Sequence, residues 1–139
     1  MTHRETVQAR GHGNVSAEHA STFEVTSDEF LTPAGDCILA VEADRTPAEF
    51  DDAFISACQD TDATITVTLE TDDHADRIGA RGHPDLTFDS DRSLVGRTSD
   101  YVDERTVAVS ATKAACDVDR DLVAALADGA AVTVTLEVE

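Results

Sequence analysis

The chain has 139 residues, of which 29 are Asp or Glu and 10 are Lys or Arg, so its formal net charge is −19. No basic run or stripe interrupts the acidic residues, which argues against nucleic acid as a partner. No apolar run approaches the roughly 20 residues of a membrane span, so a membrane protein is not expected. The length suits one domain spanning 1–139.

Arginine accounts for all the basic residues except Lys113. The apolar residues recur periodically, so the chain is expected to fold, unlike a disordered acidic tail. An acidic, almost lysine-free folded chain is typical of a cytoplasmic protein from a halophile, because concentrated salt screens its self-repulsion. A mesophilic protein with an acidic binding face is the alternative. The cysteines, which form no CxxC pair, predict buried thiols without a disulfide or zinc knuckle; they are Cys37, Cys58 and Cys116.

Four short blocks occur twice, in the same order along the chain. They are ARGH at 9–12 and 80–83, TSD at 26–28 and 98–100, AVEA at 40–43 with AVSA at 108–111, and TVTLE at 66–70 and 133–137. Collinear self-similarity of this kind indicates an internal duplication. The predicted repeats span 5–70 and 76–139.

Each predicted repeat begins with a strand, over 6–12 and 76–83. Alternation along the first strand places Arg10 and His12 on one face and Gly11 on the other. The pairs Gly-Asn and Pro-Asp follow as two-residue turn signals. They predict that the chain returns as strands over 15–25 and 86–95.

The next elements are a loop, a short buried strand, a helix and a final strand. The loops cover 26–36 and 98–104, and the buried strands cover 37–41 and 106–109. Thr46 and Glu49 at capping-box spacing, with Pro47 between them, announce the first helix. The second helix is predicted over 119–128, with Gly129 at its C-terminal cap position. Alternating residues predict closing strands over 63–70 and 130–139.

The unit is therefore β-β-β-α-β, written twice. One such unit has too little apolar cover to stand alone, so the two are expected to pack about a pseudo-twofold axis. The predicted fold is β-rich α+β, an antiparallel β-sandwich or flattened barrel. A ferredoxin-like arrangement is the alternative.

The segments RGHGNVSAEHASTFEVTSDEFLTPAGDCILAVEAD, ARGHPDL, RTSDYVDERTVAVSATKAA and DVDRDLV resemble the archaeal family of unknown function numbered 371. The resemblance covers nearly the whole chain. It implies an archaeal origin and a β-rich, sandwich-like fold. It implies no activity, cofactor, partner or catalytic residue.

Two Arg/His pairs are the candidate ligand-binding residues: Arg10 with His12, and Arg81 with His83. Each pair shares one strand face beside a turn, and an Arg fork beside a His suits a carboxylate or phosphate group. A purely structural role is the alternative, in which the arginines pair with nearby carboxylates and the adjacent glycines allow close packing.

Other residues suggest further chemistry. His12, His19 and His83, with Asp36 or Cys37, could hold a metal ion such as zinc, although no HxH or HExxH motif supports this. The loop TPAGDC at 32–37 makes the first repeat four residues longer at this point than the second. Lys113 could supply a catalytic amine, or could be an ordinary surface residue.

Three functions follow from these residues. The first is a binding domain for a small anionic molecule through Arg10, His12, Arg81 and His83. The second is a metal-dependent enzyme built on His12, His19 and His83. The third is a structural homodimer that pairs through exposed β-edges. The sequence does not decide whether the protein is an enzyme, and it specifies no cofactor.

Overall fold

Two four-stranded sheets packed face to face make up the structure, a computed structural model that describes residues 2–139. The rear sheet has the order β1-β8-β4-β5, with bounds β1 His3–Arg10, β8 Ala131–Val138, β4 Thr64–Glu70 and β5 Ala75–Arg81. The front sheet has the order β3-β2-β6-β7, with bounds β3 Ile38–Ala40, β2 Thr22–Thr26, β6 Ser93–Arg97 and β7 Thr106–Ala108. The predicted β-rich α+β class is confirmed.

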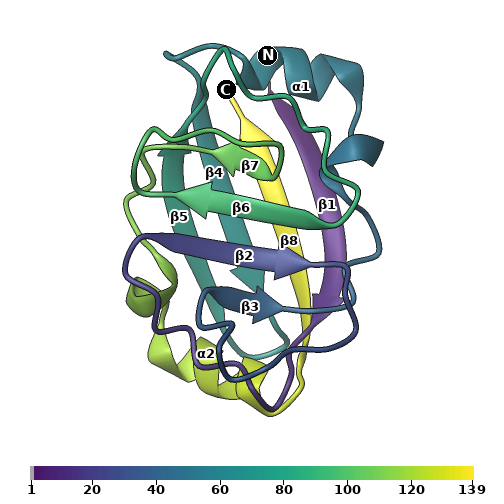
Figure 1. The fold of residues 1–139 in the computed structure, drawn as a ribbon, viewed down its shortest axis with the longest axis vertical. Coiled ribbons are helices and arrows are strands. Elements are labelled where there is room, and N and C mark those ends of the chain that lie inside the picture. Colours follow the sequence, from purple (N-terminus) through teal and green to yellow (C-terminus); the bar gives the residue numbers. More distant parts are fainter. Residues whose placement is uncertain (1) are drawn as a thin grey trace.

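The strands of the front sheet run across those of the rear sheet (Figure 1). This is the orthogonal form of sheet packing, in which corners join the two layers. Two such corners are isolated antiparallel bridges, from Arg10 to Val41 and from Arg81 to Val109. Each bridge ties the end of an edge strand of the rear sheet to the residue that follows a front-sheet strand.

The rear sheet is antiparallel throughout, as expected. Its two central strands carry the TVTLE blocks, which pair with Thr68 opposite Thr135. Alternation buries the apolar residues against the front sheet and turns the threonines outward. The buried residues of these blocks are Val67, Leu69, Val134 and Leu136.

The front sheet is mixed, which corrects the prediction of an antiparallel fold. Its central pair, β2 with β6, is antiparallel and places Glu24 opposite Val95. The outer pairs, β2 with β3 and β6 with β7, are parallel. Parallel neighbours require a connection that carries the chain back to the starting end. Residues 27–37 and 98–105 make that connection.

The predicted hairpins at the start of each half do not form. β1 pairs with β8, while the next strand, β2, belongs to the other sheet and begins only at Thr22. Residues 13–21 therefore follow an irregular path between the layers, as do residues 84–92 before β6. The turn residues act locally, whereas burial of the whole apolar face determines which strands pair.

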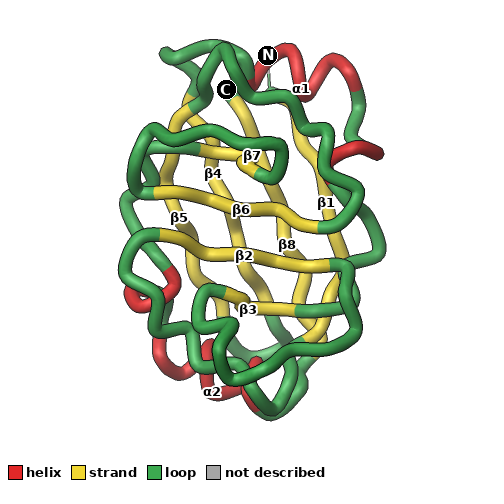
Figure 2. The backbone as a smooth tube through the Cα atoms, viewed as in Figure 1, coloured by secondary structure: helices red, strands yellow, loops and turns green. Residues whose placement is uncertain are grey.

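The helices α1 (Asp52–Cys58) and α2 (Arg120–Ala127) lie at opposite ends of the sandwich (Figure 2). The Thr46–Glu49 contact begins a separate 3₁₀ turn, Pro47–Glu49, and Asp51 then caps α1 by accepting from the Ala53 N–H. The second helix matches its prediction, and Gly129 follows it with a φ of +87°. None of the helices within residues 2–139 is long and apolar enough to cross a membrane.

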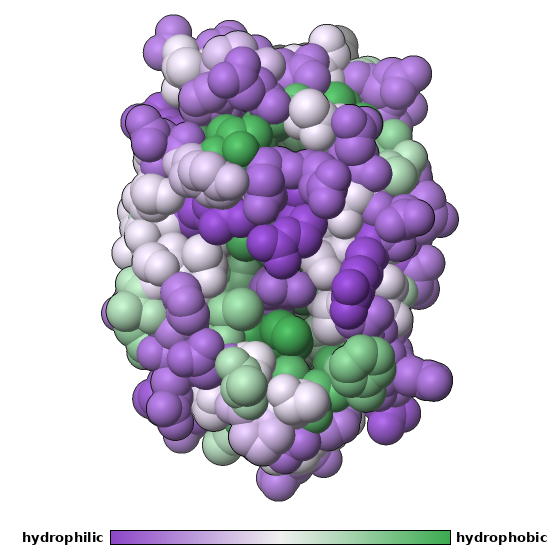
Figure 3. All heavy atoms as spheres, viewed as in Figure 1, coloured by the Kyte–Doolittle hydropathy of each residue, from purple (hydrophilic) through white to green (hydrophobic). Residues whose placement is uncertain are grey.

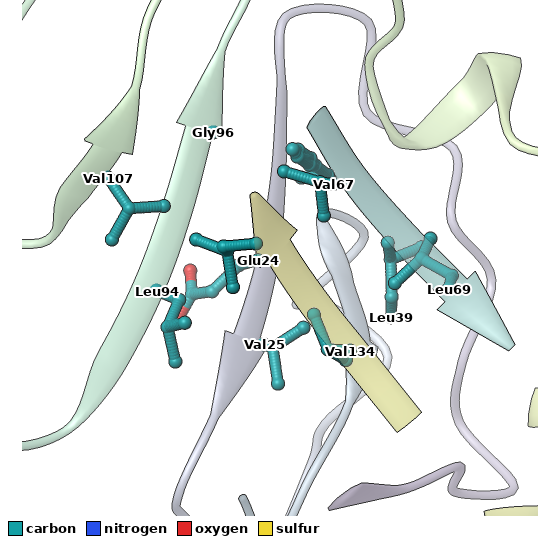
Figure 4. Close-up of a pocket in the computed structure, with 11 residues that line it drawn as sticks. Glu24, Val25, Leu39, Val67, Leu69, Leu94, Gly96, Val107 and Val134 are labelled. Atoms are coloured by element: carbon teal, nitrogen blue, oxygen red, sulfur yellow. The ribbon is translucent and has the colours of Figure 1, made fainter. Parts of the chain in front are cut away.

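One continuous core fills the space between the sheets. Aliphatic side chains from both sheets face one another across a cavity of about 20 Å³ (Figure 4). A cavity of this size holds at most one water molecule, and apolar walls keep such cavities dry. This interior space is therefore a packing defect and not a ligand site.

Candidate functional site

The two predicted Arg/His pairs lie far apart. Arg10 ends β1 and Arg81 ends β5, and these strands are the opposite edges of the rear sheet, running in opposite directions. Strand spacing and residue rise place the two Cα atoms about 30 Å apart across the sheet. The four predicted residues therefore do not converge on one shared cleft.

The arginines of these pairs differ in their surroundings. The Nε atom of Arg10 lies 2.9 Å from a carboxylate oxygen of Glu42, so this arginine is paired. Arg81 is exposed and has no ion pair among residues 2–139. If the two arginines had a purely structural role, each would be expected to pair with a carboxylate, and of the two only Arg10 does so within residues 2–139.

His12 and His83 hold their adjacent turns together. The Nδ1 atom of His12 accepts a hydrogen bond from the N–H of Asn14 at 3.0 Å, and His83 accepts from the N–H of Asp85 at the same distance. With Nδ1 acting as an acceptor, the neutral ring carries its proton on Nε2. That local bond occupies Nδ1, and in this tautomer the protonated Nε2 can donate a hydrogen bond to a ligand but cannot bind a metal ion.

The glycines between these Arg and His residues meet the helices of the opposite half. A Cβ on Gly11 would overlap the backbone of Leu126 near the end of α2, and a Cβ on Gly82 would overlap the carbonyl of Cys58 at the end of α1. Each glycine thus allows a helix end to approach a strand end closely.

His19 also has a local partner. Its Nδ1 atom accepts from the N–H groups of Ser21 and Thr22, at 3.2 and 3.1 Å, just where β2 begins. Before β6, the Oγ atom of Ser90 accepts from the N–H groups of Arg92 and Ser93 in the same way. The imidazole of His19 and the hydroxyl of Ser90 therefore accept equivalent backbone hydrogen bonds at the starts of β2 and β6.

The predicted metal site gains no geometric support. No group of three His, Cys, Asp or Glu side chains within the described range 2–139 is arranged to hold a metal ion. Cys37 lies beside Glu24, and burial first, then the Glu24 charge, raises the pKa of its thiol to about 11. This thiol is thus poorly suited to metal binding or nucleophilic attack at neutral pH.

Lys113 has a structural partner. Its Nζ atom lies 2.6 Å from Asp76 Oδ1, and the other oxygen of Asp76 accepts from the backbone N–H of Asp119, the residue that caps α2. In the first half, Arg45 pairs with the buried Glu5 at 2.7 Å, and Glu5 accepts from the N–H of Asp51, which caps α1. Lys113 therefore pairs with a carboxylate that accepts from the cap residue of α2, as Arg45 does with the carboxylate that accepts from the cap residue of α1.

A hollow lined by both arginine and apolar side chains lies on the outer face of the front sheet. This front groove has a volume of about 220 Å³. Near the centre of this face, Figure 3 shows a hollow in which apolar and hydrophilic atoms lie side by side. The groove is lined by Glu24, Asp28, Phe30, Leu31, Thr32, Gly35, Ile38, Arg92, Ser93 and Arg105.

The position of each groove residue follows from the sheet and its loops. Alternation turns Phe23 and Val25 inward and Glu24 outward from the middle of β2. Arg92 and Arg105 immediately precede β6 and β7, two parallel neighbours, and both side chains line the groove. The longer loop, residues 27–37, supplies Phe30 and Leu31 of the apolar wall, and Ile38 at the start of β3 completes it.

Charge in the front groove is balanced, unlike that of the whole chain. Arg92 binds Asp28 with Nε and Nη2, at distances between 2.6 and 3.1 Å. The hydrogen bond from Arg92 to Asp28 and the charge of Asp28 raise the pKa of Arg92, and the charge of Glu24 adds a smaller effect in the same direction. Arg105 uses Nη2 to contact Asp103 at 3.3 Å.

Local sequence did not reveal this groove. Arg92 stands in the segment DSDR, whose acidic residues suggest ordinary solvated surface, and Arg105 follows DYVDE. One sequence feature does point to this region: the loop at 26–36 is four residues longer than its counterpart at 98–104. It pointed to the segment TPAGDC, part of which now forms the groove wall.

A second hollow, of about 490 Å³, contains His83 and the exposed Tyr101. Its charged residues are otherwise all acidic: Asp85, Asp89, Asp100, Asp103 and Glu104. Such a lining repels anions. The surroundings of His83 therefore do not suit the anionic ligand expected from its sequence context.

Comparison with known proteins identifies the family. The family model described as "Domain of unknown function (DUF371)" matches residues 7–139. An uncharacterised protein of Methanocaldococcus jannaschii is 36% identical over 123 residues, which cover 88% of this chain and 90% of the relative. The match spans both sheets and both helices, and the chain therefore belongs to the DUF371 family.

Proposed function

We propose that the protein binds a small molecule carrying a carboxylate or phosphate group in the front groove, through Arg92 and Arg105. The observation that carries this proposal is the approach of two arginines to one concave, partly apolar site on a chain of net charge −19. Guanidinium groups are well matched to such oxyanions. A volume of about 220 Å³ lies just below the pockets of drug-sized ligands, so the ligand is small.

Both arginines retain unused donors. Arg92 engages Asp28 through Nε and Nη2, which leaves Nη1 without a partner in the described structure. Arg105 engages Asp103 through Nη2 alone, which leaves Nε and Nη1. Their side chains are 62% and 44% exposed, so a ligand can reach them from solvent. The acidic partners hold the two guanidinium groups in place.

Binding of isocaproate and inorganic phosphate tests this proposal, measured by calorimetry in molar KCl. Replacement of Arg105 by Gln should weaken binding by about tenfold or more, since a hydrogen bond to a charged group contributes about 1.5–3 kcal/mol. Arg81→Gln is the matched control, because Arg81 is exposed and lies on the rear sheet. Loss of binding in Arg81→Gln alone would instead favour the strand-end site of Arg81 and His83.

We also infer that the chain is an internal duplication with pseudo-twofold symmetry. The elements β1, β2, β3, α1 and β4 are followed in the same order by β5, β6, β7, α2 and β8. Exchanging the halves merely reverses the strand order of each sheet. Left-handed backbone at non-glycine residues supports the same relation, because it occurs at Ala17 and Glu42 and at the matching positions Phe88 and Ser110.

We further infer that the protein works in the cytoplasm of a haloarchaeon. The similarity to a protein of an archaeon supports an archaeal origin. The presence of 29 acidic residues against 10 basic ones supports a saline cytoplasm. A high salt concentration confines each charge's repulsion to a few Å. The acidic surface then reflects solvent and not the ligand.

A further inference from the structure

We infer that the ligand of the front groove is a zwitterion with an apolar side chain, that is, an apolar α-amino acid. This inference rests on the proposed function, because it assigns the substrate class of the same site. The structural basis is a carboxylate, Glu24, that faces the same hollow as the two arginines.

Of the two acidic residues in the groove, only Glu24 is available to a ligand. Asp28 is held by three hydrogen bonds from Arg92. Glu24 receives only a weak hydrogen bond, at 3.5 Å, from the thiol of Cys37, and it makes no ion pair within the range 2–139. Its carboxylate can therefore accept hydrogen bonds from an ammonium group.

A purely anionic ligand would leave this carboxylate in an unfavourable position. Glu24 is half-buried at the middle of β2, where solvent screens charge less well than at the rim. An oxyanion bound to Arg92 and Arg105 would lie near the Glu24 charge and be repelled by it. An ammonium group on the ligand converts that repulsion into attraction.

The remaining wall of the groove is apolar. Ile38 and the buried Leu31 line it, and Phe30 stands at its rim with 60% of its surface exposed. An exposed Phe beside an aliphatic wall is unusual in a chain this polar, and it offers contact to an aliphatic or aromatic side chain. Guanidinium groups, a carboxylate and an apolar wall together match the three parts of an apolar amino acid.

Calorimetry with matched probes tests this inference. Leucine and phenylalanine each retain both charged groups, isocaproate and hydrocinnamate lack the amine, and isoamylamine and phenethylamine lack the carboxylate. We expect each amino acid to bind about tenfold more tightly than either of its analogues, as a charged hydrogen bond contributes this much. Glu24→Gln should reduce the preference over the acid to about one.

Glu70→Gln is the control, because Glu70 lies on the rear sheet and faces away from the groove. Unfolding curves of the variants establish that each folds. Equal binding of leucine and isocaproate, both weakened by Arg105→Gln, would overturn the zwitterion and leave the anion site standing. Equal binding of leucine and isoamylamine would also overturn it. Failure of every acid and amino acid to bind would instead remove the proposed function itself.

Discussion

The Cα of Gly11 packs directly against the backbone of Leu126, so closely that a Cβ at this position would overlap the Leu126 carbonyl. This contact joins the end of β1 to the end of α2, which belong to different halves of the chain. Gly82 has the same relation to Cys58 of α1. In each copy of the ARGH motif, the glycine therefore packs against the helix that belongs to the other half of the chain.

Replacement of Gly11 by Ala should destabilise the fold by at least about 2 kcal/mol, because neither backbone can move without disturbing a strand or a helix. Chemical unfolding in molar KCl measures this loss. Gly13→Ala is the matched control, because a Cβ at Gly13 would meet no atom of residues 2–139 within 4 Å other than those of Gly13 and its chain neighbours. This substitution should change stability by less than about 0.5 kcal/mol. Equal effects of the two substitutions would contradict the close packing.

His19 should be replaceable by serine but not by alanine. Serine retains an acceptor for the N–H groups that precede β2, as Ser90 does before β6. Alanine leaves them unpaired, and we expect a loss of about 1 kcal/mol. Thermal unfolding of His19→Ser and His19→Ala measures the difference. A metal-binding role would make both substitutions equally harmful, and only in the presence of the metal.

The Lys113–Asp76 pair should contribute stability at neutral pH. Burial alone would raise the pKa of Asp76, but hydrogen bonds from Lys113 and from the N–H groups of Asp119 and Arg77 outweigh it and lower the pKa below 3.8. Because the folded pKa is depressed, this contribution is present above pH 3.8 and disappears as the pH falls further. Lys113→Met should cost about 1 kcal/mol at pH 7 for this partly exposed pair.

The cost of Lys113→Met should shrink as unfolding is measured at decreasing pH below about 4. Lys113→Arg provides the control, because Arg45 makes the equivalent contact with Glu5. A pH-independent cost for the methionine variant would contradict the ion pair.

Salt dependence should reveal how the acidic surface is tolerated. At a net charge of −19, self-repulsion opposes the folded state, and added salt shortens its range to a few Å. The free energy of unfolding should therefore rise with KCl concentration from low to molar salt. Equilibrium unfolding at a series of KCl concentrations measures this trend. Stability that is flat or decreasing with KCl would contradict the halophilic assignment.

Sequence patterns predicted those parts of the fold that depend on neighbouring residues. Alternation identified β4 and β8, and helix periodicity with Gly129 identified α2. The course of residues 13–21 was not predictable in this way, because turn signals do not specify whether β1 pairs with β2 or with β8. That choice depends on how two sheets bury their apolar faces together.

The candidate site was less predictable than the fold for the same reason. Arg92 and Arg105 line one groove because β6 and β7, which they precede, are parallel neighbours, and the sequence patterns did not predict this pairing. Glu24 lines the same groove because β2 pairs with β6. His12, by contrast, was conspicuous in a repeated motif, yet its Nδ1 atom serves the adjacent turn.

The three thiols should differ widely in reactivity. Cys116 is exposed, whereas burial raises the pKa of Cys58 to about 12 and, with the Glu24 charge, that of Cys37 to about 11. Only the thiolate reacts with alkylating agents. At neutral pH we therefore expect iodoacetamide to modify Cys116 first, as measured by mass spectrometry of peptides from the folded protein.

Glu24→Gln sharpens this prediction, because it removes the negative charge beside Cys37 and leaves burial unchanged. The pKa of Cys37 should then fall toward its ordinary value of 9.0, and its alkylation should accelerate relative to the parent protein. Cys58, whose pKa is raised by burial alone, should react as slowly as before and serves as the internal control. Unchanged reactivity of Cys37 would show that Glu24 does not act on this thiol, and would weaken the placement of its carboxylate in the front groove.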